Sequence, residues 1–244
     1  MTLPPLDPLD LAALLCSRVC HDIISPVGAI INGLEVLEEE KDAEMRGFAL
    51  DLIKKSAEQA SARLQFSRLA FGAAGSAGAL IDTSDAETVA RSLLGTERTV
   101  FKWDVPAVLM PKNKVKLILN LCLIGAAAIA RGGILEVTVS GMDGAERIRV
   151  AAKGQGAKLS SHLPPLIAGV PAQAPSTPQD IQAYYTGLVA KAAGLAVTAS
   201  AGADLVAFEA EPLPGEKPAR EIMPQPAEAL SDTALRGPAA ELTS

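Results

Sequence analysis

Apolar side chains recur at helical spacing through the first seventy residues of the chain. About 3.6 residues make one turn, so one set forms a single broad stripe: Leu11, Leu15, Val19, Ile23, Val27, Ile30, Leu34 and Leu37. A second set follows the acidic stretch 38–42: Met45, Phe48, Leu52, Ile53, Ala57, Ala60, Leu64 and Phe71. Residues 7–72 are therefore predicted to form a helical hairpin. Two helices cannot cover both stripes, so we expect two chains to pair as a homodimer with a four-helix bundle.

The pattern changes after a glycine- and alanine-rich linker at 72–79, where a second domain is predicted over 80–213. A capping box at Ser84 and Glu87 predicts a helix ending at Leu94. Further helices are predicted from Lys112 to Arg131 and from Thr177 to Gly194. Alternating residues predict strands at 99–105, 134–140, 146–152, 195–200 and 205–211.

Helices interleaved with strand hairpins indicate an α/β sandwich with helices on one face of a mixed sheet. The whole chain is then an α+β protein, with the hairpin first and the sandwich second. Residues 214–244 are rich in proline, alanine and glutamate, and we expect this tail to be disordered.

His21 lies on the side of the first helix opposite the apolar stripe. It shares this polar side with Ser17, Ser25, Gly28 and Asn32, so its ring is predicted to be accessible to another protein. Pro26 cannot donate to the carbonyl of residue 22, so it is expected to kink or loosen the helix one turn beyond His21. The alternative interpretation is that His21 is an ordinary polar surface residue. For the adjacent Asp22, a role in orienting the ring and a simple solvated acid remain equally open.

Composition excludes several classes of function. The net charge of −6 and the pI of about 5.1 argue against a nucleic-acid partner. The longest apolar run, 117–130, is interrupted by Asn120 and is too short to span a bilayer, so we expect a cytoplasmic protein with no membrane contact. Three cysteines fit a reducing compartment. Cys16 and Cys20 point toward the apolar stripe, so they are expected to be core residues and no metal site is predicted.

Arg147, Arg149 and Lys153 occupy positions of one predicted strand that share a face of the sheet. We interpret this face as a second contact surface for an acidic patch on a partner. A merely solvated sheet face is the equally open alternative.

Three motifs resemble those of a sensor histidine kinase core. The run 17–34 resembles the box that carries the phosphorylated histidine, the run 116–121 resembles the N-box helix, and 153–156 resembles the glycine-rich turn of the nucleotide pocket. The pocket departs from the kinase pattern in three places. Ile124 stands where a second asparagine would help hold magnesium, Ala152 stands where an aspartate would bind adenine, and the stretch 159–185 has prolines in place of a second glycine-rich loop.

An intact histidine box beside a degenerate nucleotide pocket resembles the ChpT family of bacterial histidine phosphotransferases. That family joins a dimeric histidine hairpin to a degenerate ATPase-like domain of the GHKL (Bergerat) type. The resemblance implies that His21 accepts a phosphoryl group from the receiver aspartate of a hybrid histidine kinase. His21 would then pass the group to response regulators of the CtrA and CpdR kind, which control the cell cycle.

The same resemblance implies that the chain binds no ATP and no cofactor of its own, and that Mg²⁺ comes with the partner's receiver domain. The side chains of Ser17, Arg18, Ser25, Gly28 and Asn32 would form the docking surface around His21. Two alternatives remain: an active ATP-dependent histidine kinase, and a dimeric adaptor that moves no phosphate.

Overall fold

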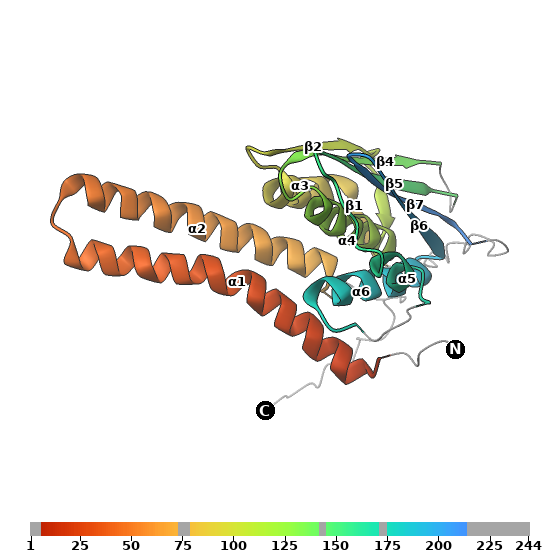
Figure 1. The fold of residues 1–244 in the computed structure, drawn as a ribbon, viewed down its shortest axis with the longest axis horizontal. Coiled ribbons are helices and arrows are strands. Elements are labelled where there is room, and N and C mark those ends of the chain that lie inside the picture. The colour runs from red at the N-terminus through yellow and green to blue at the C-terminus, as the bar shows by residue number, and fades with distance from the viewer. Residues whose placement is uncertain (1–5, 73–78, 142–144, 171–174, 214–244) are drawn as a thin grey trace, which may run out of the picture.

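Two long antiparallel helices form the N-terminal part of the protein (Figure 1). In the computed structural model, which describes residues 6–72, 79–141, 145–170 and 175–213, these helices are α1 (Pro8–Glu39) and α2 (Ala43–Ala70). Aspartates cap both N-termini: Asp7 accepts from the amide of Leu9, and Asp42 accepts from the first-turn amides of α2. The predicted N-terminal helical hairpin is confirmed.

Small residues bring the two helices close together. Gly33 is buried, and a Cβ atom built on it would lie 2.6 Å from Ile53 Cγ1 and 3.3 Å from the carbonyl oxygen of Ala49. Ala49, Ser56 and Ala60 are buried on α2. A larger side chain at 33 would push the helices apart, so this glycine fixes their separation.

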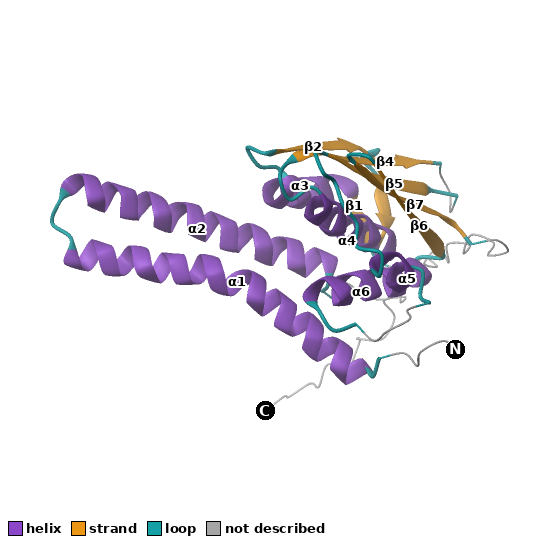
Figure 2. Ribbon diagram, in the orientation of Figure 1, coloured by secondary structure: helices purple, strands orange, loops and turns teal. Residues whose placement is uncertain are grey.

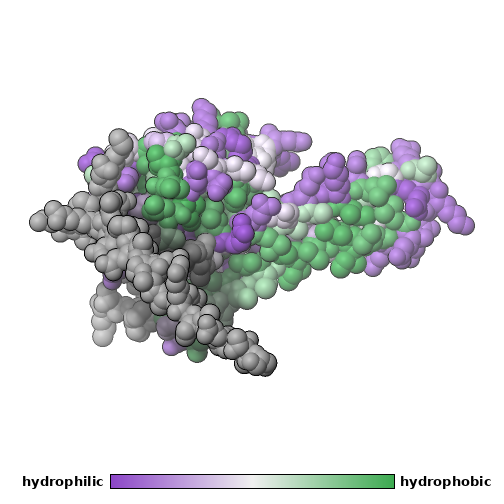
Figure 3. Space-filling model, turned by 180° about the vertical axis from the view of Figure 1, so that it is seen from behind, coloured by the Kyte–Doolittle hydropathy of each residue, from purple (hydrophilic) through white to green (hydrophobic). Residues whose placement is uncertain are grey.

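A large apolar surface remains uncovered on the hairpin of a single chain. The exposed apolar side chains of this surface come from both helices: Ile24, Val27, Ile31 and Leu34 on α1, and Met45, Phe48 and Leu52 on α2. We call these seven residues the hairpin apolar face, and Figure 3 shows apolar surface continuing along the hairpin. The predicted stripe is thus only partly buried within one chain, since Val27 and Leu34 are exposed.

Helix α1 is also long enough and apolar enough to cross a membrane, judged by its length and composition alone. The same helix packs along α2 and carries charged and polar side chains at Arg18, His21 and Asp22. Packing against α2 thus makes α1 one half of a hairpin.

The C-terminal part is a five-stranded sheet with helices on one face (Figure 2). Its strand order is β2-β4-β5-β7-β6, with β2 parallel to β4 and all other neighbours antiparallel. The bounds of the strands are β2 (Thr99–Asp104), β4 (Gly133–Ser140), β5 (Arg147–Lys153), β6 (Leu195–Gly202) and β7 (Leu205–Pro212). This mixed sheet confirms the predicted α+β class and α/β sandwich.

The helices of this part are α3 (Thr83–Leu94), α4 (Lys112–Ala128), α5 (Leu163–Ile167) and α6 (Pro178–Ala192). Helix α4 is the centre of the core, because Val115, Leu117, Ile118, Leu119 and Leu121 are all fully buried. The inner faces of β4, β5 and β7 pack against it through Leu135, Val150 and Phe208.

Several local predictions need correction. The N-cap of α3 is Asp82 and not Ser84, since the Asp82 carboxylate accepts from the Ser84 amide. Helix α4 ends at Ala128, three residues before the predicted Arg131. The small sheet of β1 (Leu80–Asp82) and β3 (Leu109–Pro111) and the short α5 were not predicted. Most of the linker, the turn at 142–144 and the tail at 214–244 lie outside the described residues.

Candidate functional site

His21 projects from the middle of α1 into solvent, with 81% of its side chain exposed. Its Nδ1 atom lies 3.6 Å from Oδ1 of Asp22. This distance is within ion-pair range but too long for a hydrogen bond. Because the carboxylate faces Nδ1, it favours a proton on that atom, which leaves the lone pair on Nε2 for attack on a phosphoryl group.

The polar side of α1 around His21 is as predicted. Ser17, Ser25 and Asn32 are exposed, and Gly28 is partly exposed. A Cβ atom built on Gly28 would meet no atom within 4 Å, so nothing in the described chain fills the space beside it. The imidazole therefore lies on a surface of small side chains that a partner can approach closely.

Pro26 lies inside α1, one turn beyond Asp22, and its side chain is buried. It cannot donate the backbone hydrogen bond to the carbonyl of residue 22, and its ring crowds that carbonyl. Figure 1 shows α1 running beside α2 at the hairpin tip and diverging from it toward its own N-terminus. The N-terminal half of α1 thus reaches α6, and Pro26 lies in the middle of the helix, next to the turn that carries His21.

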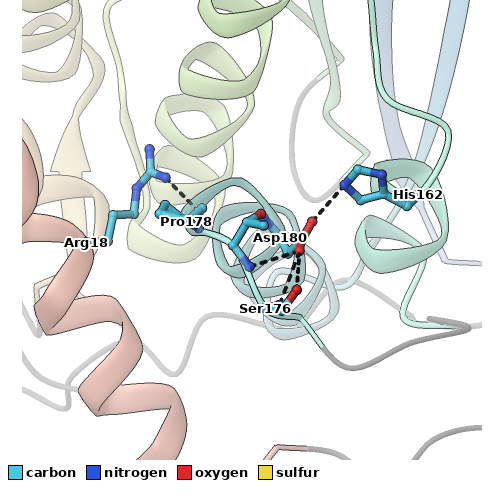
Figure 4. A network of polar contacts seen from close by, with 6 residues as sticks. Arg18, His162, Ser176, Pro178 and Asp180 are labelled. Atoms are coloured by element: carbon cyan, nitrogen blue, oxygen red, sulfur yellow. Dashed lines mark hydrogen bonds and ion pairs between the residues drawn. The ribbon is translucent and has the colours of Figure 1, made fainter.

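Arg18 does not belong to the open surface around His21. Its Nη1 atom donates to the carbonyl oxygen of Pro178 at 2.7 Å, which joins α1 to the first turn of α6 (Figure 4). Burial lowers the pKa of the Arg18 guanidinium, an effect that the charge of Asp22 opposes. Arg18 thus makes a contact within the chain, and its contact with a partner stays a prediction.

The start of α6 is a polar cluster around Asp180. The side chain of Thr177 accepts from the Asp180 amide, the Asp180 carboxylate accepts from the amides of Ser176 and Thr177, and His162 Nε2 lies 2.8 Å from Asp180 Oδ1 (Figure 4). Burial works against the charge of Asp180, but the hydrogen bonds from Ser176 and Thr177 and the nearby His162 together lower its pKa. The cluster rigidifies the turn that Arg18 holds.

Asn120, the matched asparagine of the N-box, is fully buried and occupied within the protein. Its Nδ2 donates to the carbonyls of Ala70, at the end of α2, and Lys116, and its Oδ1 accepts from Gln182 of α6. This asparagine joins both parts of the protein, and its oxygen is already engaged by Gln182. Ile124, one turn later on α4, offers only aliphatic carbon.

The glycine-rich turn after β5 is also held by the chain itself. The amide of Gly154 donates to the carbonyl of Asp204, and the amide of Gly156 donates to the Asp204 carboxylate at 2.6 Å. Asp204 has a φ of 56°, which makes the tight turn between β6 and β7. Sequence reasoning missed this residue, although an aspartate beside Ala203 in a short strand connection is a turn signal. Ala152 is buried and supplies no carboxylate.

The three basic residues of β5 share one exposed face, as predicted, but each has an acidic neighbour. Arg147 lies 3.6 Å from Glu211, Arg149 lies 3.5 Å from Glu209 and Lys153 lies 3.6 Å from Glu136;. This face is charge-balanced rather than positive. Its role as a contact for an acidic partner stays a prediction. The acidic neighbours reduce the net positive charge that the sequence suggested for this face.

Cys16 and Cys20 are exposed, so the prediction that they are core residues is wrong for the single chain. A hydrogen bond that the Cys20 thiol donates to Cys16, together with the charge of Cys16, raises the pKa of Cys20. Cys122 is buried in α4, and burial raises the pKa of its thiol. No cluster of three or more metal-binding side chains occurs within the described residues.

Comparisons with known proteins place this arrangement among phosphotransferases. Residues 83–205 match a family described as "Histidine phosphotransferase C-terminal domain". The protein phosphotransferase ChpT of Brucella abortus (strain 2308) is 50% identical over 212 residues, which are 86% of this chain and 100% of the relative. A bacterial phosphotransferase of known structure is 47% identical, with a TM-score of 0.77, over 86% of this chain and 100% of that one. The histidine kinase AdeS of Acinetobacter baumannii aligns at 11% identity and a TM-score of 0.43, over 80% and 98% of the two chains.

Proposed function

Because this chain belongs to the ChpT family of histidine phosphotransferases, we propose that it relays phosphoryl groups through His21 without using ATP. The observation that carries this proposal is the exposed imidazole on an open surface of α1. In the forward step Nε2 of His21 attacks the phosphorus of a receiver's aspartyl phosphate, the P–O bond to the aspartate breaks, and the phosphoryl group becomes bonded to nitrogen. The reverse step, on a second receiver, returns the group to an aspartate.

The relay needs little chemistry from this protein. Phosphoryl transfer depends mainly on positioning and on charge neutralisation by a metal, which the receiver supplies as Mg²⁺. The Asp22 carboxylate, 3.6 Å from Nδ1, would favour the tautomer that leaves the lone pair on Nε2. The donor is the receiver domain of a hybrid histidine kinase, and the acceptors are response regulators of the CtrA and CpdR kind that control the cell cycle. We place this exchange in the cytoplasm.

The state of the degenerate pocket supports a relay over an ATP-dependent kinase. Asn120 is locked by three hydrogen bonds, and Ile124 and Ala152 replace the groups that would bind magnesium and adenine. The hairpin apolar face supports a homodimer, since a second copy would cover it and leave the polar side of α1 free.

The direct test is labelling of the full chain by a radiolabelled phospho-receiver, run beside labelled ATP with magnesium. We expect rapid labelling from the receiver and none from ATP. The chain contains two histidines, which makes a matched pair of variants possible. His21→Ala should abolish labelling, whereas His162→Ala should keep it because His162 pairs with Asp180 away from the open surface. Labelling from ATP would establish a kinase, and labelling of His21→Ala would refute His21 as the acceptor.

Substitutions at two glycines test whether the surface around His21 is where a receiver docks. Neither Gly28, two turns beyond His21 on α1, nor Gly47, on α2, has an atom within 4 Å of a built Cβ, so both tolerate a larger side chain. Gly28→Leu should slow transfer from the receiver about tenfold or more by blocking close approach, while Gly47→Leu should leave the rate unchanged. Equal rates for the two variants would place the docking surface elsewhere.

A further inference from the structure

The second histidine of the chain lies apart from the surface around His21. His162 directly precedes α5, and 58% of its side chain is exposed. The chain contains no histidine besides these two. An accessible imidazole accepts a phosphoryl group on nitrogen when a donor reaches it, so the surroundings of His162 decide whether it is a second acceptor.

A buried carboxylate lies against one edge of the His162 ring. Nε2 of His162 is 2.8 Å from Oδ1 of Asp180, and the Asp180 side chain is only 9% exposed (Figure 4). At His21 the corresponding distance is longer, 3.6 Å from Nδ1 to Oδ1 of Asp22, and that side chain is 37% exposed. A carboxylate acts more strongly on a ring when it is closer and less screened by water, so His162 has the stronger acid partner.

The two oxygens of Asp180 face different groups. Oδ2 accepts hydrogen bonds from the backbone amides of Ser176 and Thr177, which hold the carboxylate in place. Oδ1 is enclosed and receives no hydrogen bond from any other described residue, so the ring of His162 is the group available to it. Such an oxygen favours a proton on the nearer ring nitrogen, Nε2, and leaves the lone pair on Nδ1.

Nδ1 of His162 makes no hydrogen bond or ion pair within the part of the chain that the structure describes. The polar contact of the ring is made by Nε2, and most of the side chain is exposed. An attack by Nδ1 gives the ring a positive charge, which the buried Asp180 carboxylate stabilises without any proton having to move. The geometry thus supplies a nucleophile and the acid that stabilises its charge.

We propose that Nδ1 of His162 is a second phosphoryl acceptor, which takes its phosphoryl group from a small phosphoryl donor and not from a receiver domain. The lone pair of Nδ1 attacks phosphorus, the bond from phosphorus to its leaving group breaks, and the leaving group departs with that electron pair. Nε2 keeps its proton against Asp180. A receiver docked on the hairpin would face His21, whereas a small donor needs no docking surface and reaches any exposed ring.

The test is incubation of the full chain with phosphoramidate, a small donor whose leaving group is ammonia. In His21→Ala, His162 is the remaining histidine, so we expect one acid-labile phosphoryl group per chain. The double variant His21→Ala/His162→Ala should carry none. Phosphorus NMR of His21→Ala should locate the group on Nδ1, since Nε2 is turned toward Asp180.

Asp180→Asn tests the role of the carboxylate. It removes the charge beside Nε2, so labelling of His162 by phosphoramidate should slow at least fivefold, while labelling of His21 in the same molecules should not change. Glu209→Gln, which removes an exposed carboxylate on β7, is the matched control and should label both histidines at the wild-type rate. Circular dichroism checks that each variant is folded.

Labelling by a phospho-receiver separates this site from the relay. His21→Ala should take no label from the receiver and still take label from phosphoramidate. No acid-labile label in His21→Ala, a phosphoryl group on Nε2 of His162, or an unchanged rate in Asp180→Asn would each overturn the proposal. A wild-type chain that takes no label from any receiver would instead refute the relay and leave the His162 site standing.

Discussion

At the scale of single residues, the properties of α1 change within one helical turn. His21 is open to solvent, the partly buried Asp22 has its carboxylate 3.6 Å from the His21 ring, and Arg18, three residues earlier, reaches into the other half of the protein. The separation follows from the 100° step between successive helical residues. His21, the candidate acceptor, Asp22, the candidate orienting residue, and Arg18, the anchor to α6, thus lie on different faces of the same short segment.

Asp22 is expected to act as a positioning residue. An ion pair near 3.6 Å in an exposed place is weak, so Asp22→Asn should slow labelling of His21 only by roughly fivefold. Asp22→Glu should recover part of the rate because it restores the charge. The measurement is the single-turnover rate of transfer from a phospho-receiver, and an unchanged rate in Asp22→Asn would make the residue a solvated acid.

Arg18 is expected to stabilise the fold. Arg18→Ala leaves the carbonyl of Pro178 without its donor, so the free energy of unfolding should fall by about 1–3 kcal/mol in urea denaturation. Lys54→Ala, an exposed position on α2, is the control and should change stability little. Full stability in Arg18→Ala combined with slower transfer would restore the earlier interpretation of Arg18 as a docking residue.

At the scale of elements, most boundaries are set by local capping. Asp7, Asp42 and Asp82 each begin a helix, and Thr177 with Asp180 forms a complete capping box at α6. The last of these has an added function, because the same turn is held by Arg18 and His162. The start of α6 therefore joins the hairpin to the sandwich.

Asp180 gives this junction a pH dependence. The pKa of Asp180 is lowered in the folded protein, so its contribution to stability is complete above the unfolded pKa of about 3.9 and is lost as the pH falls through the lower folded value. Asp180→Asn should lower the free energy of unfolding by about 1–2 kcal/mol at neutral pH, and the difference should shrink in strong acid.

Urea denaturation of both proteins across the acid range tests this expectation. Glu209→Gln is the control, since its ion pair with Arg149 is exposed and should contribute little. A difference between Asp180→Asn and the wild type that stays constant with pH would mean that the charge of Asp180 is unimportant.

At the scale of the whole molecule, the hairpin apolar face requires a partner. Seven exposed apolar side chains along two adjacent helices form a surface of the kind that soluble proteins usually cover. Pairing of two hairpins would bury it and leave both His21 surfaces outside. The second copy would thus complete the bundle without competing with a receiver.

Ile31→Glu tests the dimer. A buried, unpaired carboxylate in the middle of this face is strongly unfavourable, so the variant should sediment as a monomer while the wild type sediments as a dimer. Ala196→Glu, exposed on β6 and away from the hairpin, should remain a dimer. A monomeric wild type, or a dimeric Ile31→Glu, would contradict the predicted interface.

The sequence by itself determined what depends on near neighbours. Helical periodicity predicted the hairpin and the exposure of His21, Ser17 and Asn32, and alternation predicted the strands of the main sheet. The match of 17–34 to a histidine box, together with the degenerate nucleotide pocket, indicated the family. These features were readable because the residues that decide them lie within a turn or a few strand positions of one another.

The tertiary structure decided what depends on residues far apart in the chain. Arg18 meets Pro178, Asn120 meets Ala70 and Gln182, and Asp204 holds Gly156 across the β6–β7 turn. Three-residue strands such as β1 exist only because a distant segment pairs with them. No local pattern encodes such pairings, since each partner's hydrogen bonds are satisfied only after the chain has folded.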